Sequence, residues 1–149
     1  MTAAPPPQAP GLARRAACAV YDLLLVLALV LVATFPFLAF AGDATTGWRR
    51  HALQAYVVAV AGAYFVGFWT RGGQTLPMKT WRIRLERTDG SPVDAGRAAR
   101  RYLFALAGGA ALGIGYLWAF LDRDGQYLHD RLAGTRLADL REPPQRRSA

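Results

Sequence analysis

The chain has 149 residues, 53% of them hydrophobic, and a formal net charge of +8. The charges are segregated, because long uncharged blocks alternate with short basic segments. A soluble basic protein interleaves the two kinds of residue, so the pattern disfavours a soluble domain and is typical of an integral membrane protein. Nucleic-acid binding is a poor explanation of the basic segments, because membrane orientation accounts for the same charges.

The two ends of the chain predict disordered tails around a single membrane domain. Residues 1–11 are rich in proline, and the first ten of them carry no charged side chain. No signal peptide is expected, since the first apolar block is too long for the hydrophobic region of one. We therefore predict a tail over residues 1–11, a membrane domain over 12–138 and a second tail over 139–149.

Three uncharged blocks are long enough to cross a bilayer as helices. Residues 23–41 and 52–70 form blocks of 19 residues each, and residues 102–121 form a block of 20. A bilayer core of about 30 Å needs roughly 20 residues of helix. The chain is therefore expected to be an all-α integral membrane protein in which the first two blocks are transmembrane helices.

The third block has two readings, because glycines gather at its centre. A helix weakened in this way can turn back as a re-entrant hairpin, or glycines in G-x-x-x-G spacing can form a face that packs closely on a neighbouring helix. The glycines concerned are Gly108, Gly109, Gly113 and Gly115.

The charge distribution bears on the same question. A hairpin would put 16 Lys and Arg residues on one side of the membrane and two on the other, whereas a full span would give ten and eight. The positive-inside rule favours the uneven split, with both termini in the cytoplasm. The prediction is two spans plus a third Gly-rich membrane helix or re-entrant hairpin.

The segment between the second and third blocks has its own expected structure. Residues 81–87 alternate apolar and polar side chains, which indicates a half-buried strand. A strand needs a partner for its backbone groups, and residues 135–137 are the best candidate. Pairing them would give a small cytoplasmic two-strand element.

A basic helix is expected after this strand and the turn that follows it. Asp94 is a suitable N-cap. Arg97, Arg100 and Arg101 would then lie at the lipid headgroups, where the helix enters the third block.

Asp22 is the most informative single residue, because it lies within the first apolar segment. A carboxylate in a membrane span needs a partner or a wet cavity. Arg15 lies two helical turns earlier on the same face, with Cys18 between them, so the three form a polar stripe. Two readings remain open: Asp22 pairs with an arginine from another element and fixes the packing, or it belongs to an ion or solute site.

A second polar cluster follows the third block over residues 122–135. His129 and Asp130 are adjacent there, but neighbours on a helix face different ways, so a capping or network role is favoured over an acid–base pair. No nucleophile stands nearby, and no histidine or cysteine has metal-ligand spacing. We therefore predict no enzymatic activity, no metal and no cofactor.

Four short motifs occur in order along the chain. Arg15 and Asp22 lie in RAACAVYD, GQTLPMK follows at 73–79, a strand-like segment ends in DG at 83–90, and LHDRLAGT lies at 128–135. Together these motifs resemble the RDD family of bacterial membrane proteins over residues 12–137. The resemblance implies a multi-pass protein of the bacterial inner membrane.

The family is named for one arginine and two aspartates, which correspond here to Arg15, Asp22 and Asp130. The resemblance implies that these three bind a ligand or ion. Pro77 departs from the family pattern, which has glycine there, yet proline fits the first turn of a short helix capped by Thr75. The supporting motif residues are Gly73, Gln74, Thr75, Lys79, His129, Gly134 and Thr135.

The molecular role of the family is undefined, and transport of unknown ligands has been suggested for it. One hypothesis is therefore a small transporter or transporter subunit for an ion or solute, which would need a homo-oligomer. The other is an accessory or scaffold protein, bound to another membrane protein, whose Arg15, Asp22 and Asp130 form an internal polar lock. The basic central segment also suggests contact with anionic lipid headgroups.

Overall fold

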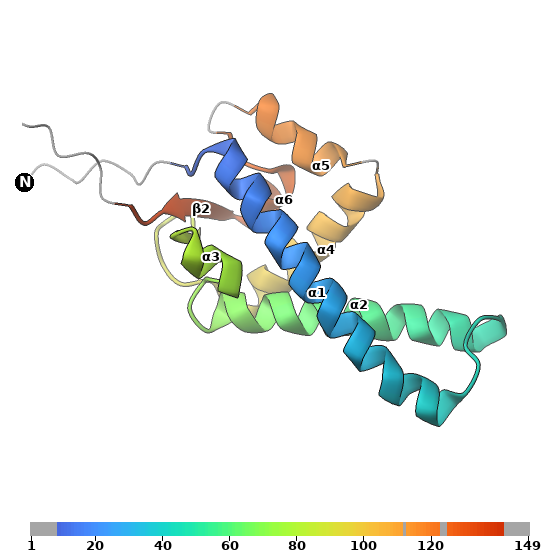
Figure 1. The fold of residues 1–149 in the computed structure, drawn as a ribbon. Coiled ribbons are helices and arrows are strands. Elements are labelled where there is room, and N and C mark those ends of the chain that lie inside the picture. The colour runs from blue at the N-terminus through green and yellow to red at the C-terminus, as the bar shows by residue number, and fades with distance from the viewer. Residues whose placement is uncertain (1–8, 112, 123–124, 142–149) are drawn as a thin grey trace, which may run out of the picture.

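The computed structural model describes residues 9–111, 113–122 and 125–141, and most of them are helical (Figure 1). The elements in chain order are α1 (Leu12–Ala41), α2 (Gly47–Thr70), α3 (Leu76–Thr80), β1 (Ile83–Arg87), α4 (Ala95–Ala110), α5 (Ile114–Leu117), the 3-10 helix η1 (Trp118–Phe120), α6 (Leu128–Ala133) and β2 (Thr135–Asp139).

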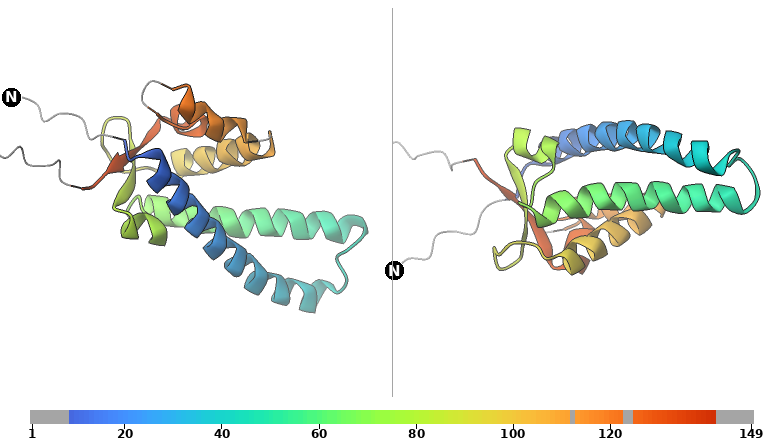
Figure 2. Two further views of the ribbon diagram at one scale, coloured as in Figure 1. Left: turned by 45° about the horizontal axis from the view of Figure 1, so that its top comes forward. Right: turned by 90° about the horizontal axis from the view of Figure 1, so that it is seen from below.

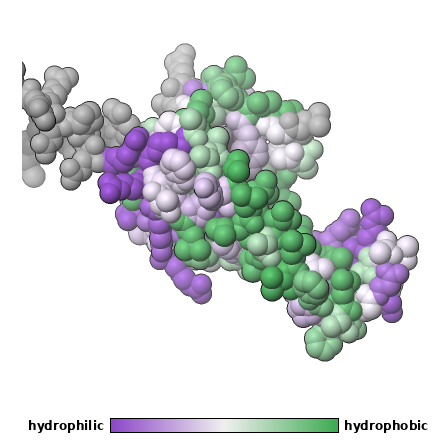
Figure 3. Space-filling model, in the orientation of Figure 1, coloured by the Kyte–Doolittle hydropathy of each residue, from purple (hydrophilic) through white to green (hydrophobic). Residues whose placement is uncertain are grey.

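The first two helices are long and apolar enough to cross a membrane. α1 has 30 residues and α2 has 24, and they lie side by side with their connection at one end of the molecule (Figure 2). Large apolar side chains on α1 face outward, among them Phe35 at 73% exposure and Phe40 at 93%. Figure 3 shows this apolar surface over α1, between hydrophilic ends. A surface of this kind is what lipid tails cover.

The third block is not one straight helix. α4 and the α5–η1 segment are bent by 106° relative to each other, as in a broken span or a re-entrant loop. Gly113 caps α5 with a φ of +77°, a conformation that glycine adopts without strain. A Cβ added at Gly108 would lie 3.2 Å from the Cα of Gly115, so these two glycines let the arms of the bend approach closely.

The predicted strand pair is present. β1 and β2 are antiparallel, with Leu85 opposite Leu137, which confirms residues 135–137 as the partner of the alternating segment. β2 continues to Asp139, and Pro10 is fully buried, so both residues belong to the folded part. The remainder of the predicted tails, residues 1–8 and 142–149, lies outside the described residues.

The core lies at the end of the molecule that holds the strands. Apolar side chains from α1, α2, α3, β1 and α4 meet there, whereas the far halves of α1 and α2 have mostly exposed side chains. The buried apolar cluster consists of Cys18, Trp69, Met78, Ile83, Leu85, Val93 and Ala98. Arg14 ties the start of α1 to this end, since its guanidinium donates to the Trp81 carbonyl and pairs with Asp139.

Candidate functional site

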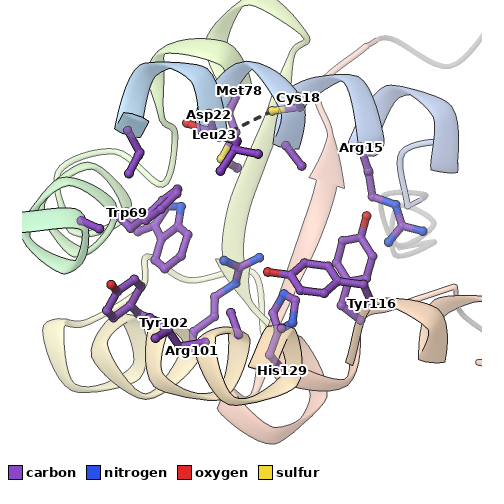
Figure 4. A pocket seen from close by; sticks show the side chains of 18 of the residues that line it. Arg15, Cys18, Asp22, Leu23, Trp69, Met78, Arg101, Tyr102, Tyr116 and His129 are labelled. Carbon is purple, nitrogen blue, oxygen red and sulfur yellow. Dashed lines mark hydrogen bonds between the residues drawn. The ribbon is translucent and has the colours of Figure 1, made fainter. Parts of the chain in front are cut away.

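The polar stripe expected on α1 is present and buried. Arg15, Cys18 and Asp22 are 4%, 5% and 7% exposed, although most of their neighbours on the helix face outward. Their spacing places them on one face of the helix. This face is turned toward α4 and the strands (Figure 4).

Asp22 is held by hydroxyl groups. Its Oδ2 accepts a hydrogen bond from Thr75 Oγ1 at 2.8 Å, and its Oδ1 accepts one from the Tyr64 hydroxyl at 3.0 Å. The Cys18 thiol also points at the carboxylate, with its sulfur 4.0 Å away. Among the described residues no arginine forms an ion pair with Asp22. Hydroxyl groups therefore bind the carboxylate in place of the arginine partner that was one of the two predictions.

The GQTLPMK motif supplies one of those donors and positions it. Thr75 caps α3 by accepting from the Met78 N–H at 3.4 Å, as predicted, and Pro77 occupies the first turn. Gly73 has a φ of +71°, and an added Cβ would lie 2.3 Å from the Leu85 carbonyl oxygen. Its own carbonyl accepts from the Leu85 N–H at 2.7 Å, so the motif is fastened to β1.

The other two polar residues of the GQTLPMK motif, Gln74 and Lys79, differ in their contacts and exposure. Gln74 donates its side-chain amide to the Ile83 carbonyl at 2.7 Å and so reinforces the attachment to β1. Lys79 lies in the last turn of α3 and is exposed. The motif is therefore mainly a structural support for Thr75.

Asp130 pairs with Arg101. The Arg101 Nε donates to Asp130 Oδ1 at 2.6 Å, and the two side chains are 8% and 1% exposed. Thr135 adds a hydrogen bond to the same oxygen at 3.2 Å. The prediction that Arg101 lies at the lipid headgroups is therefore wrong: a buried carboxylate 29 residues away holds it inside the fold.

Arg101 also contacts an aromatic ring. Its guanidinium carbon lies 4.2 Å from the centroid of the Trp69 ring, within the range of a cation–π interaction. The pair thus joins α2, α4 and α6 at one point. Its neighbour Arg100 is exposed, and its predicted position at the headgroups stays a prediction.

His129 lies between aromatic rings and stays neutral. Its ring stacks on Tyr127 with centroids 5.2 Å apart, and the Tyr116 ring meets it edge-on. Burial, together with the Arg101 charge, lowers the pKa of His129 to about 4, against a smaller opposing effect of Asp130. Its Nε2 is 3.9 Å from Asp130 Oδ2, which is longer than a hydrogen bond, so the network role is favoured over an acid–base pair.

The turn after His129 is built by Gly134. This residue ends α6 with a φ of +66°, and an added Cβ would lie 2.7 Å from Arg97 Nη1. Thr135, which follows, is fully buried and begins β2. The LHDRLAGT motif therefore contains both the glycine that ends α6 and the threonine hydroxyl that binds Asp130.

Arg15 has a different environment from the two aspartates. Its guanidinium carbon lies 4.7 Å from the centroid of the Tyr127 ring. The Nε atom is buried and has no hydrogen-bond partner among the described residues. Arg15, Asp22 and Asp130 thus form no direct lock with one another: each has its own partners.

A cavity of about 570 Å³ lies between α1 and α4, and Arg15, Asp22 and Arg101 all line it. Figure 4 shows the labelled Arg15, Asp22, Arg101 and His129 around it, with Trp69 and Tyr102 at one side. The other wall is apolar. Its lining there includes Val20, Leu23, Val26, Ala105, Leu106 and Gly109.

Sequence reasoning missed four residues of this site: Tyr64, Trp69, Arg101 and Tyr127. All four lie in segments that were assigned to spans, headgroups or loops by their composition. The only signal in the sequence was the need of each buried aspartate for a donor, which does not say where along the chain the donor lies.

Comparison with known proteins gives one match. A family model described as the RDD family matches residues 9–134, which is most of the chain. No curated protein and no solved structure matches it.

Proposed function

Because the chain belongs to the RDD family, we propose that it is a membrane transport protein, or a subunit of one, which holds a small solute in the cavity between α1 and α4. The observation that supports this is the cavity itself. Its volume of about 570 Å³ is within the range of small-molecule sites, which are mostly apolar with a few convergent polar groups. The cavity between α1 and α4 has that composition.

In this proposal the three family residues have different roles. Arg15 contacts the solute, since its side chain lines the cavity and keeps a buried N–H without a partner among the described residues. Asp22 and Asp130 hold the walls in place, because hydroxyl groups bind both oxygens of Asp22 and Arg101 pairs with Oδ1 of Asp130. The aspartates are then positioning residues rather than ion carriers.

In the proposed orientation the chain lies in a bacterial inner membrane with both termini on the cytoplasmic side. The start of α1, α3, β1 and β2 share one end of the molecule (Figure 1). If α4 and α5 form a re-entrant element, 16 of the 18 Lys and Arg residues lie on that side. The positive-inside rule assigns such a side to the cytoplasm, where anionic headgroups would contact the basic residues.

Transport would also require an assembly. Two long helices and a bent third element cannot enclose a pathway across a bilayer by themselves. We propose that a second copy of the chain, or another membrane protein, completes the path. A strict monomer in mild detergent that nevertheless catalyses flux would contradict this part of the proposal.

Flux in reconstituted vesicles tests the transport proposal. Three probes cover the candidate solutes: ²²Na⁺, ³²P-phosphate and a fluorescent alkyl phosphate whose passage between leaflets is followed by chemical quenching. Transport predicts that at least one probe moves faster than in protein-free vesicles and that Arg15→Gln abolishes the difference. Arg100→Gln, which removes an exposed charge near the same end, is the matched control. No movement of any probe would refute the proposal.

The second candidate is a scaffold or accessory protein, and one observation favours it. Both oxygens of Asp22 and one oxygen of Asp130 accept hydrogen bonds inside the fold, as residues of a structural lock do. Asp22→Asn separates the two functions. A lower yield of Asp22→Asn, together with no flux of any probe by the native protein, supports the scaffold. A lower yield with native flux per folded molecule supports a transporter in which Asp22 only positions the wall, and lost flux at normal yield would contradict that positioning role.

A further inference from the structure

We propose, on the basis of the solute site above, that the occupant of the cavity is an amphipathic anion: an alkyl chain that carries a carboxylate or phosphate headgroup. The headgroup would lie at Arg15, and the chain would run along the apolar wall between α1 and α4. The same chemistry is offered by a lipid of the bilayer and by a free alkyl acid or alkyl phosphate.

The headgroup end is set by Arg15. Its side chain is 4% exposed and lines the cavity, and its Nε has no hydrogen-bond partner among the described residues. A buried guanidinium N–H without a partner is costly, and a carboxylate or phosphate oxygen is the partner that its fork-shaped geometry fits best. The ring of Tyr127 lies over one face of the guanidinium, with its centroid 4.7 Å from the guanidinium carbon.

The neighbouring charges leave Arg15 as the group that attracts an anion. Asp130 neutralises Arg101 at 2.6 Å, so the second guanidinium of the cavity is already paired. Asp22 lies two helical turns from Arg15, roughly 10 Å along the helix axis. Its oxygens face the hydroxyls of Thr75 and Tyr64. Among the described residues, a negative headgroup at Arg15 therefore meets no carboxylate paired with that guanidinium.

The alkyl part of the occupant follows from the other wall. Val20, Leu23 and Leu106 line the cavity and are also 56%, 66% and 40% exposed at the surface. The cavity therefore opens between α1 and α4 onto the apolar surface that lipid tails would cover. An alkyl chain fits such an opening, because its far end can remain among the lipid tails.

Native mass spectrometry of the intact protein in a neutral detergent tests this inference. Four probes are added in turn: dodecyl phosphate, dodecanoate, dodecanol and inorganic phosphate. We expect a one-to-one complex with the two alkyl anions. Arg15→Gln should weaken it about 10- to 100-fold, the usual effect of losing a hydrogen bond to a charged group. Arg100→Gln should leave it unchanged.

A second variant keeps the test valid if Arg15→Gln does not fold. Gly109 lines the cavity, and the nearest atom to an added Cβ there is Tyr116 Cε2 at 3.9 Å. Gly109→Leu should therefore fold, fill the space and abolish binding of every alkyl probe. Unchanged binding of dodecyl phosphate to this variant would overturn the inference.

Two other outcomes would also overturn it. If dodecanol binds as tightly as dodecyl phosphate, the site does not select a negative charge. If inorganic phosphate alone binds as tightly, the chain contributes nothing and the occupant is not amphipathic. Mass peaks of a phospholipid retained from the host membrane would identify the bilayer as the source. A protein that carries no such lipid but binds dodecyl phosphate would identify a free alkyl anion.

Binding and transport fail separately in these experiments. An alkyl anion that binds but never crosses the vesicle membrane leaves the ligand assignment intact and removes the transport proposal. Flux of ²²Na⁺ without any binding of the alkyl anions keeps transport and removes this assignment.

Discussion

The hydroxyl of Thr75 lies 2.8 Å from Oδ2 of Asp22 and at the same time caps α3 through the Met78 N–H. One side chain therefore joins the end of a short helix to a buried carboxylate on the first span. The link explains why a motif after α2 and an aspartate in α1 occur together in the sequence. It also makes Thr75 the most direct test of the role of Asp22.

Replacing Thr75 with valine should lower the free energy of unfolding by about 2 kcal/mol, because the cap and one hydrogen bond to a charged group are both lost. Thr75→Ser should retain most of the stability. Thr80, an exposed residue of the same helix whose hydroxyl bonds to the Leu76 carbonyl, provides the control. Unfolding in mixed micelles measures the effect, and equal losses for Thr75→Val and Thr80→Val would show that the link to Asp22 contributes nothing.

Breaking the Arg101–Asp130 pair should be costly, whereas removing both charges should be tolerated better. Either Arg101→Gln or Asp130→Asn leaves a buried group without its partner, which costs about 3–5 kcal/mol. The double variant Arg101→Met, Asp130→Leu should lose less than the sum of the two changes. A double-mutant cycle in mixed micelles gives the coupling, and strict additivity would mean that the two side chains act independently.

Stability should fall as the pH is lowered from about 7 to 4, because of His129. Its pKa is about 4 in the folded protein, below the ordinary value of 6.5. In this pH window the unfolded chain binds a proton that the folded protein does not. The free energy of unfolding therefore falls by about 3 kcal/mol as the pH is lowered. Above pH 7 the residue is neutral in both states and contributes no slope.

His129→Gln should flatten this part of the stability profile. His51 is exposed, with its ring near Gln54, so His51→Gln should leave the slope as it is in the native chain. Unfolding in mixed micelles at half-unit pH intervals compares the three proteins. A native profile that is flat between pH 4 and 7 would contradict the prediction.

Adjacent glycines should differ sharply in their tolerance of a side chain. Gly73→Ala places a Cβ 2.3 Å from the Leu85 carbonyl at a φ of +71°, so the motif must detach from β1 or distort. We expect a loss of more than about 2 kcal/mol, since both overpacking and backbone strain contribute. Gly72→Ala has no atom within 4 Å of the added carbon and should change stability little. Similar melting temperatures for the two variants would contradict this account.

The parts of the fold that follow from local pattern were predictable. Uncharged blocks indicated α1 and α2, and strict alternation indicated β1. The third block was left open between two readings because glycine clusters serve both bends and close packing. The structure has the bend at Gly113, and Gly108 meets Gly115 between its two arms. Gly109 and Gly113, which have the G-x-x-x-G spacing, make no close contact with a neighbouring helix among the described residues.

Only some residues of the candidate site could be predicted from the sequence. The sequence indicated Asp22 and Arg15, because a carboxylate in an apolar block needs a partner, and the resemblance to the RDD family added Asp130. It assigned Arg101 to the membrane surface, since a count of basic residues cannot tell a buried guanidinium from a solvated one. The cavity between α1 and α4 was beyond reach, because no pattern along the chain reports which faces of two distant helices meet.

The separation of Asp22 from its donors has a consequence for biosynthesis. Tyr64 and Thr75 follow Asp22 by 42 and 53 residues, so the first helix is complete well before either hydroxyl has been made. During that interval the carboxylate has only water, headgroups or the insertion machinery as partners. The hydrogen bonds that hold Asp22 in the folded protein can therefore form only after α2 and Thr75 have been translated. The order of synthesis thus sets the earliest point at which Asp22 can reach its final partners.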